Sequence, residues 1–118
     1  MAVTIPATNV YRTKVAAAAA AGGALPAASK IVFGTGTSDS SPDDTALDAE
    51  VFRKDLDSAS SADTVLTCVG ELSGTDSGAH ITEVGILDED NDLMGGRSFL
   101  PKQLEAESSL EFTLDFQF

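Results

Sequence analysis

Few residues in this sequence combine the types and the spacing that catalysis or metal binding requires. His80 is the one histidine and Cys68 the one cysteine, so a nucleophilic triad has a single base available, and zinc would lack its three or four Cys and His ligands. Cys68 lies in an apolar run, which predicts a buried thiol. His80 borders a glycine-rich turn, where a solvated side chain is usual. We therefore expect neither an enzyme nor a bound cofactor.

Three alternating aspartates are the weak candidates for a metal site. Asp88, Asp90 and Asp92 are spaced like the first ligands of a calcium-binding loop, where alternate carboxylates converge on one cation. The remainder of that loop is missing, because Leu93 stands where its tight turn needs glycine and Phe99 where its bidentate glutamate should be. The pattern favours a solvated acidic turn, with a weak cation site as the alternative.

Two charged residues interrupt apolar segments. Glu83 lies within residues 81–87, and Arg53 follows two apolar residues. A lone charge in a protein core is strongly destabilising unless it finds a partner. We therefore expect Arg53 to pair with Glu50 or Glu83 and to join a short helix to the central strand; the alternative is that both side chains reach water.

Charge is distributed unevenly along the chain. Before Asp39 there is no acidic residue, and Arg12, Lys14 and Lys30 contribute three positive charges; from Asp39 onward 19 acidic residues face 4 basic ones, for a net charge of -12. Such an excess repels nucleic-acid phosphates and anionic membrane surfaces, so neither is an expected partner. The 12 aspartates, scarce lysines and many alanines are similar to proteins of salt-loving archaea and their viruses, with an ordinary acidic protein as the alternative.

One alanine-rich helix is predicted near the N-terminus. Thr8 and Asn9 are good N-cap residues, apolar residues then recur at helical spacing, and Gly22-Gly23 can adopt a left-handed stop. Residues 10–21 are therefore predicted to form a helix with a narrow apolar face.

A polar segment at residues 34–44 has no apolar residue and is predicted to be a surface loop. Its Gly34-Thr-Gly36 start does not complete a phosphate-binding motif and is interpreted as turn chemistry. At its end, Ser41, Pro42 and Asp44 match the start of a second, short helix, with serine as the cap and an acid three residues later.

The remaining segments are rich in β-branched and apolar residues and are predicted as strands. A strand is favoured from Val51 onward, with a longer helix as the alternative. After the acidic turn, residues 93–100 are expected to return as the hairpin partner of residues 80–87. The other predicted strands are residues 30–33, 64–72, 80–87 and 93–100.

The clearest pattern is the last one. Leu110, Phe112, Leu114, Phe116 and Phe118 alternate with polar residues, which predicts a strand with all five side chains on one buried face. A shift of one residue would expose the phenylalanines and bury carboxylates, so the register is strongly determined.

Together these elements predict a single domain over residues 1–118, with a helical arm at 1–29 and a β-rich body at 30–118. The expected fold is mainly β, with an α+β fold as the alternative: a small, mostly antiparallel sheet or sandwich with one N-terminal helix and one short second helix. No apolar run approaches the length of a membrane helix, so a soluble protein is expected.

Several motifs, in this order, resemble the tail-collar fibre proteins of tailed viruses. They are Gly-x-Gly at 34–36, Thr-x-Leu-x-x-Glu-x-x-Arg at 45–53, Glu-x-Gly-Ile-x-Asp at 83–88 and Leu-Met-Gly-Gly-Arg at 93–97, between the alanine helix and the alternating strand. The resemblance covers nearly the whole chain and implies a scaffold role for Leu47, Glu50, Arg53, Glu83, Gly85 and Asp88. It departs where many relatives continue into a fibre shaft beyond the position of Phe118, and where a common Asp-Gly turn is replaced by Asp90-Asn-Asp-Leu.

The resemblance implies a structural virion protein, made in the host cytoplasm and located in the virion tail. Its function would be that of a tail-fibre, collar or baseplate adaptor that anchors fibres and assembles as a homo-oligomer, with other copies of itself and other tail or fibre proteins as partners. The alternatives are a capsid decoration or turret protein, and a module that binds host glycans; the latter is disfavoured because the sequence has no tryptophan and one tyrosine.

Overall fold

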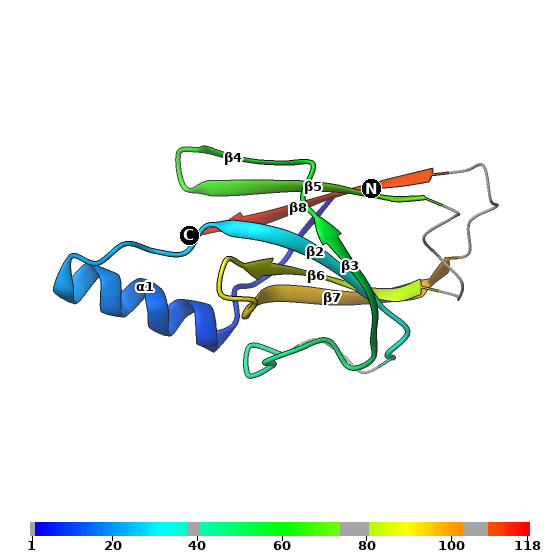
Figure 1. The fold of residues 1–118 in the computed structure, drawn as a ribbon, viewed down its shortest axis with the longest axis horizontal. Coiled ribbons are helices and arrows are strands. Elements are labelled where there is room, and N and C mark those ends of the chain that lie inside the picture. Colours follow the sequence, from blue (N-terminus) through cyan, green and yellow to red (C-terminus); the bar gives the residue numbers. More distant parts are fainter. Residues whose placement is uncertain (1, 38–40, 74–80, 103–108) are drawn as a thin grey trace.

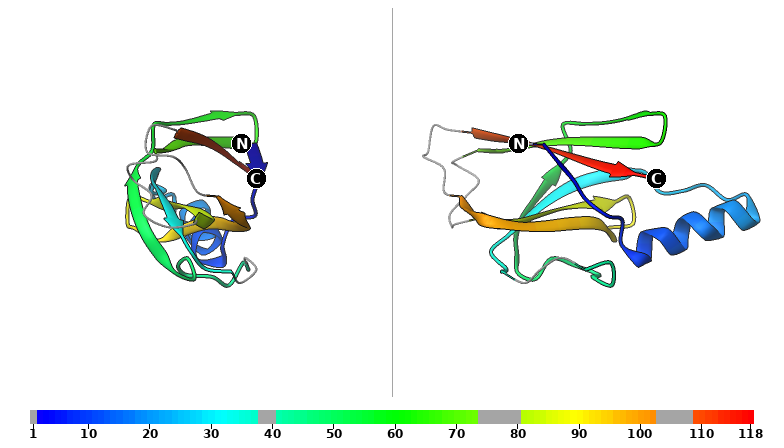
Figure 2. Two further views of the ribbon diagram at one scale, coloured as in Figure 1. Left: turned by 90° about the vertical axis from the view of Figure 1, so that its right-hand side faces the viewer. Right: turned by 180° about the vertical axis from the view of Figure 1, so that it is seen from behind.

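Two four-stranded sheets packed face to face form the body of the protein (Figures 1 and 2). The computed structural model describes residues 2–37, 41–73, 81–102 and 109–118. Neighbouring strands are antiparallel except for the pair β1–β8, which is parallel. The prediction of a mainly β, mostly antiparallel fold is confirmed. In spatial order the first sheet contains β1 (Ala2–Thr4), β8 (Ser109–Gln117), β5 (Val65–Ser73) and β4 (Ser58–Ala62), and the second β3 (Glu50–Asp55), β2 (Ala28–Gly34), β6 (Ile81–Asp88) and β7 (Leu93–Lys102).

The core lies between the two sheets, where the alternating strand β8 contributes its apolar face. Phe112, Leu114 and Phe116 are at most 1% exposed, which confirms the predicted register. The ring of Phe112 lies 5.4 Å from that of Phe33 on β2, so aromatic contacts join the two sheets. The sheets also approach closely at Gly70, where an added Cβ would lie 2.8 Å from side-chain atoms of Ile31.

The last residue of the alternating pattern departs from the prediction. Phe118 is 53% exposed, although the period of two places it on the face of Phe116. It follows the last residue of β8, and its ring contacts only Phe116, at 6.2 Å, and Tyr11 of the helix, at 6.0 Å, among the aromatic contacts described. The expectation that Phe118 is buried was wrong because the ring lies at the end of the sandwich, between a strand end and a helix. The side chain of Leu110 lies outside the described residues.

The predicted N-terminal helix is confirmed as α1 (Asn9–Ala21). The side-chain oxygen of Thr8 accepts a hydrogen bond from the Tyr11 N–H at its start, and Gly22 ends it with a left-handed φ of 74° and an N–H bond to the Ala18 carbonyl. Tyr11 is the one residue of α1 that is fully buried. Most of the helix therefore extends beyond the sheets, as Figure 1 shows.

The segment that leads into α1 joins the two sheets at one edge. The N–H of Ile5 donates to the Asp115 carbonyl of β8 at 2.9 Å, and that of Thr8 donates to the Met94 carbonyl of β7 at 2.7 Å. The N-terminal arm is therefore more than helical, because β1 is part of the first sheet. The sequence pattern predicted neither β1 nor β4.

The second predicted helix is absent from the described residues, and its supposed start is an isolated turn. Only half of the helix-start pattern forms: the Ser41 N–H donates to Asp44 Oδ2 at 2.8 Å, but the Asp44 N–H donates to the Ser41 backbone carbonyl at 3.0 Å, which closes a turn, and the Ser41 hydroxyl oxygen accepts the Asp43 N–H at 3.2 Å. The chain then leaves the helical path because Leu47 packs on Val32, Leu87 and Leu93 on the outer face of the second sheet. Tertiary burial outweighs the local capping signal.

Candidate functional site

The three aspartates of the acidic turn surround a lysine. Lys14 extends from α1, and its Nζ lies 2.7 Å from Asp88 Oδ2, 2.7 Å from Asp92 Oδ2 and 3.2 Å from Asp90 Oδ2. The carboxylates approach one another closely enough to hold a metal ion. In this arrangement the cation that they hold is the ammonium of Lys14. A metal ion would have to displace this group, so the cluster acts as an ionic attachment of the helix to the β6–β7 turn.

Asp88 serves the turn and the helix with different oxygen atoms. Its Oδ1 accepts the backbone N–H of Asp90 at 2.9 Å and of Asp92 at 3.1 Å, while Asn91 takes a left-handed φ of 64° between them. Its Oδ2 is left for Lys14. Because the Asp88 side chain has no exposed surface, this is the buried member of the cluster, whereas those of Asp90 and Asp92 are about half exposed.

The electrostatics of the cluster favour a charged lysine. Burial opposes the charge, but hydrogen bonds from Lys14 to Asp88, Asp92 and Asp90 outweigh it and raise the pKa of Lys14 above its ordinary value of 10.5. The lysine therefore stays protonated at any physiological pH. The cluster has three carboxylates and one ammonium group, so its formal net charge is negative.

A second buried carboxylate, Glu83, is held by backbone groups. Its Oε2 accepts the N–H of Gly36 at 2.8 Å and of Ala49 at 2.7 Å, and its Oε1 accepts the N–H of Asp48 at 2.9 Å. Thr82 adds a hydroxyl bond of 2.5 Å to the Gly36 carbonyl. Glu83 thus attaches both ends of the loop between β2 and β3 to the outer face of β6.

The two glycines of the Gly-x-Gly motif make room for this carboxylate. An added Cβ would lie 2.5 Å from Glu83 Oε2 at Gly36 and 2.6 Å from the Ala49 carbonyl at Gly34. Gly34 is the last residue of β2, and the anion that the Gly36 N–H binds is the chain's own Glu83.

Arg53 pairs with Glu50 rather than with Glu83. On β3 its Nε lies 2.6 Å from Glu50 Oε2 and its Nη2 lies 2.9 Å from Oε1, a two-pronged contact between partly exposed side chains. Of the two predicted partners, the neighbour on the same strand is the one that the structure brings together. No second helix is present in the described residues for this pair to join.

Cys68 is the cysteine that the sequence offered as a possible nucleophile. Cys68 has no exposed surface, as predicted, and burial together with the nearby Asp115 raises the pKa of its thiol to about 11. A thiol in this state is a poor nucleophile at neutral pH. His80 lies outside the described residues.

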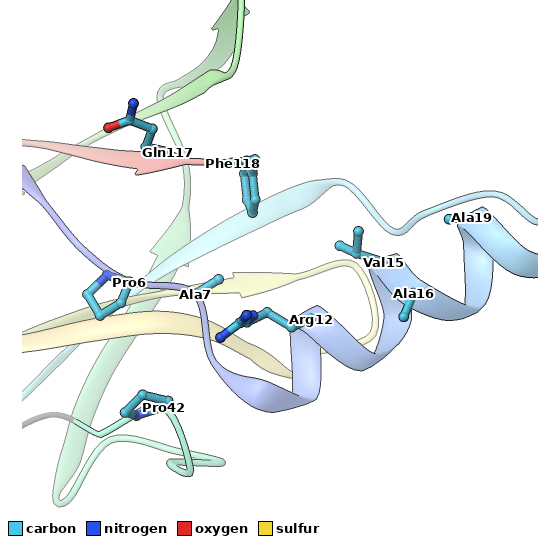
Figure 3. Close-up of a pocket in the computed structure, with 9 residues that line it drawn as sticks. All are labelled: Pro6, Ala7, Arg12, Val15, Ala16, Ala19, Pro42, Gln117 and Phe118. Atoms are coloured by element: carbon cyan, nitrogen blue, oxygen red, sulfur yellow. The ribbon is translucent and has the colours of Figure 1, made fainter.

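Sequence reasoning missed a surface at the end of the sandwich beside α1. An apolar groove of about 530 Å³ runs between the helix and the end of β8, and Phe118 also borders a second hollow next to the turn between β4 and β5. Four groove residues from α1, at 12, 15, 16 and 19, have the spacing of one helical face, which is the signal that a sequence search could have used. The groove is lined by Pro6, Ala7, Arg12, Val15, Ala16, Ala19, Pro42, Gln117 and Phe118 (Figure 3).

α1 has 13 residues, which is too short to cross a membrane, and the described part of the chain holds no longer helix. A scan of protein-family models and searches of curated proteins and of solved structures found no match to this chain.

Proposed function

We propose that this chain is a structural virion protein of a tailed virus, a tail-fibre, collar or baseplate adaptor that assembles through subunit contacts. The proposal is supported by what the residues behind the tail-collar resemblance do. Glu83 and Gly36 hold the β2–β3 loop, and Leu47 packs over the second sheet, where an added Cβ at Gly85 would lie 3.1 Å from it. Asp88 attaches the helix. These positions act as framework, as expected of a scaffold.

The observation that carries the proposal is the projecting helix. Ala16, Ala17, Ala19, Ala20 and Ala21 are all exposed, and the helix stands beside an apolar groove at one end of an elongated molecule of 47 × 26 × 21 Å. Apolar surface that stays open on one copy is characteristic of subunits that bury it against neighbours. The ionic attachment through Lys14 holds this helix at a defined position for such contacts.

Light scattering of the purified protein in low salt and in molar salt tests the assembly role. We expect a defined oligomer in at least one of the two conditions. A monodisperse monomer in both would contradict the proposal, because the adaptor is proposed to assemble with other copies of itself.

The location in the particle is tested separately by labelling this chain in purified virions and imaging them. Label at the tail, collar or baseplate is the expected result. Label over the capsid surface would instead favour the decoration or turret protein that the sequence leaves as the alternative.

A further inference from the structure

The end of the sandwich beside α1 combines an apolar centre with one charge of each sign. We call it the end surface and define it as Arg12, Val15, Ala16, Ala19, Asp63 and Phe118. Phe118 borders both the groove along α1, which contains Arg12, and the hollow at the β4–β5 turn, which contains Asp63. Phe118 is therefore shared by the hollow that contains the cation and the hollow that contains the anion.

Phe118 is a fixed feature of this surface rather than a loose side chain. Its ring stacks on Phe116 at 6.2 Å and lies 6.0 Å from Tyr11, yet 53% of the residue stays exposed. Its backbone N–H donates to the Thr64 carbonyl at 2.8 Å, which ties it to the β4–β5 turn. Figure 3 shows the ring at the end of β8 facing the helix. Aromatic residues that are rigid and half exposed are common anchors of protein interfaces.

The two charges of the end surface have no ion-pair partner within the described residues. Of the three cations that precede Asp39, Lys14 is bound by the acidic turn and Lys30 lies 3.7 Å from Asp55. Arg12 and Asp63 belong to none of the described ion pairs, and both are exposed. Asp63 is held at the turn by a left-handed φ of 53°. A complementary surface would therefore present an anion to Arg12 and a cation to Asp63.

A second copy of this chain meets that requirement. In a two-fold contact, each residue that touches a partner residue is touched in return. An axis close to Phe118, between Arg12 and Asp63, brings each arginine opposite the other copy's aspartate. The small side chains of Ala16 and Ala19 let backbones approach closely at such a contact.

We propose that two copies of this chain associate through the end surface about a two-fold axis near Phe118, with Arg12 of each copy paired with Asp63 of the other. The inference rests on the proposed function, because it names the surface through which copies assemble. The net charge of -12 gives two copies a general repulsion. Contact at a place where each copy presents both signs minimises that cost.

The test uses two charge reversals, Arg12→Glu and Asp63→Arg, and sedimentation velocity at physiological salt. Each variant alone would face itself with like charges, so we expect its self-association to weaken at least tenfold relative to wild type. In an equimolar mixture, the glutamate introduced in one variant faces the arginine introduced in the other, and the native Arg12 and Asp63 remain paired in the same complex. We expect the mixture to associate within about threefold of the wild-type Kd, which a merely local effect on folding would not produce.

Matched controls separate the contact from net charge. Arg97→Glu on β7 and Asp57→Arg before β4 change exposed residues by the same charge and are expected to leave association unchanged. Phe118→Ala is expected to weaken association at least tenfold. Circular dichroism verifies that each variant is folded.

The outcomes distinguish this inference from the broader proposal. Wild-type protein that associates while both reversals leave its Kd unchanged, or a mixture that stays dissociated, would overturn the end-surface contact and leave the assembly role standing. Controls that weaken association as much as the reversals would overturn it as well. A wild-type monomer under all salt conditions would overturn both.

Discussion

Glu83→Gln is the substitution for which the structure makes the sharpest energetic prediction. The side chain keeps its shape but exchanges one acceptor oxygen for an NH2 group. If the remaining oxygen keeps its hydrogen bonds from the N–H groups of Gly36 and Ala49, the new NH2 group faces the N–H of Asp48, and two donors oppose each other. An unsatisfied donor costs ~1–3 kcal/mol, and each remaining bond loses its charge assistance, so the total cost is about 3 kcal/mol.

Two measurements test this value. Chemical denaturation is expected to show unfolding free energy lower by about 3 kcal/mol, which for a chain of this length lowers Tm by about 12 °C. Hydrogen exchange should accelerate by about a hundredfold at the amides of Gly36, Asp48 and Ala49, provided that local opening dominates. Glu71→Gln is the matched control, because Glu71 is exposed on β5, and its expected change stays within about 0.5 kcal/mol. Equal stability of the two variants would refute the role assigned to Glu83.

Two further predictions concern the other buried polar groups. Lys14→Met leaves the fully buried Asp88 without its cation, and we expect urea unfolding at neutral pH to show a loss of about 3 kcal/mol in unfolding free energy. The control Asp90→Asn changes an exposed partner of the same lysine and is expected to cost less than about 1 kcal/mol. Similar losses for both variants would contradict the role assigned to the Lys14–Asp88 pair. The Cys68 thiol has an ordinary pKa of 9.0 and a folded pKa of about 11, so the unfolded state loses its proton first and stability declines as pH rises from 9 to 11. Between pH 8 and pH 10.5 we expect about 2 kcal/mol of this decline to be absent in Cys68→Ala; equal declines in both proteins would contradict the raised pKa. Lys14 and Tyr11, whose pKa values are also raised in the fold, contribute a decline of the same sign to both proteins.

Local sequence signals predicted those elements whose own residues decide them. The register of β8 followed from strict alternation, since any shift would bury carboxylates, and α1 followed from Thr8 at its start and Gly22 at its end. The acidic turn was recognised as a turn because Asp88 organises it within five residues.

Long-range contacts were beyond such signals. Lys14 lies 74 residues from Asp88, and nothing in either neighbourhood indicates that the aspartates bind an ammonium group rather than a solvated ion. The sequence offered Glu83 as one of two predicted partners of Arg53, because charge pairing is the usual way to bury a carboxylate. Three backbone N–H groups from the β2–β3 loop bind the Glu83 carboxylate instead. Every non-proline residue has a backbone N–H, so the residue types of a loop do not indicate which of these groups will bind a carboxylate.

The sequence by itself determined the mainly β character, the alanine-rich helix, the charge imbalance and the burial of Cys68, because period, capping and apolar content act within a few residues of one another. Only the tertiary structure decided that Ser41 begins a turn and not a helix, that the serine-rich β4 is a strand through its pairing with β5, and that Phe118 is exposed. Each of these depends on which surface another segment covers. Which surfaces are covered depends on how the whole chain packs, because the free energy gained by burying apolar area is larger than the helix or strand propensity of a few residues.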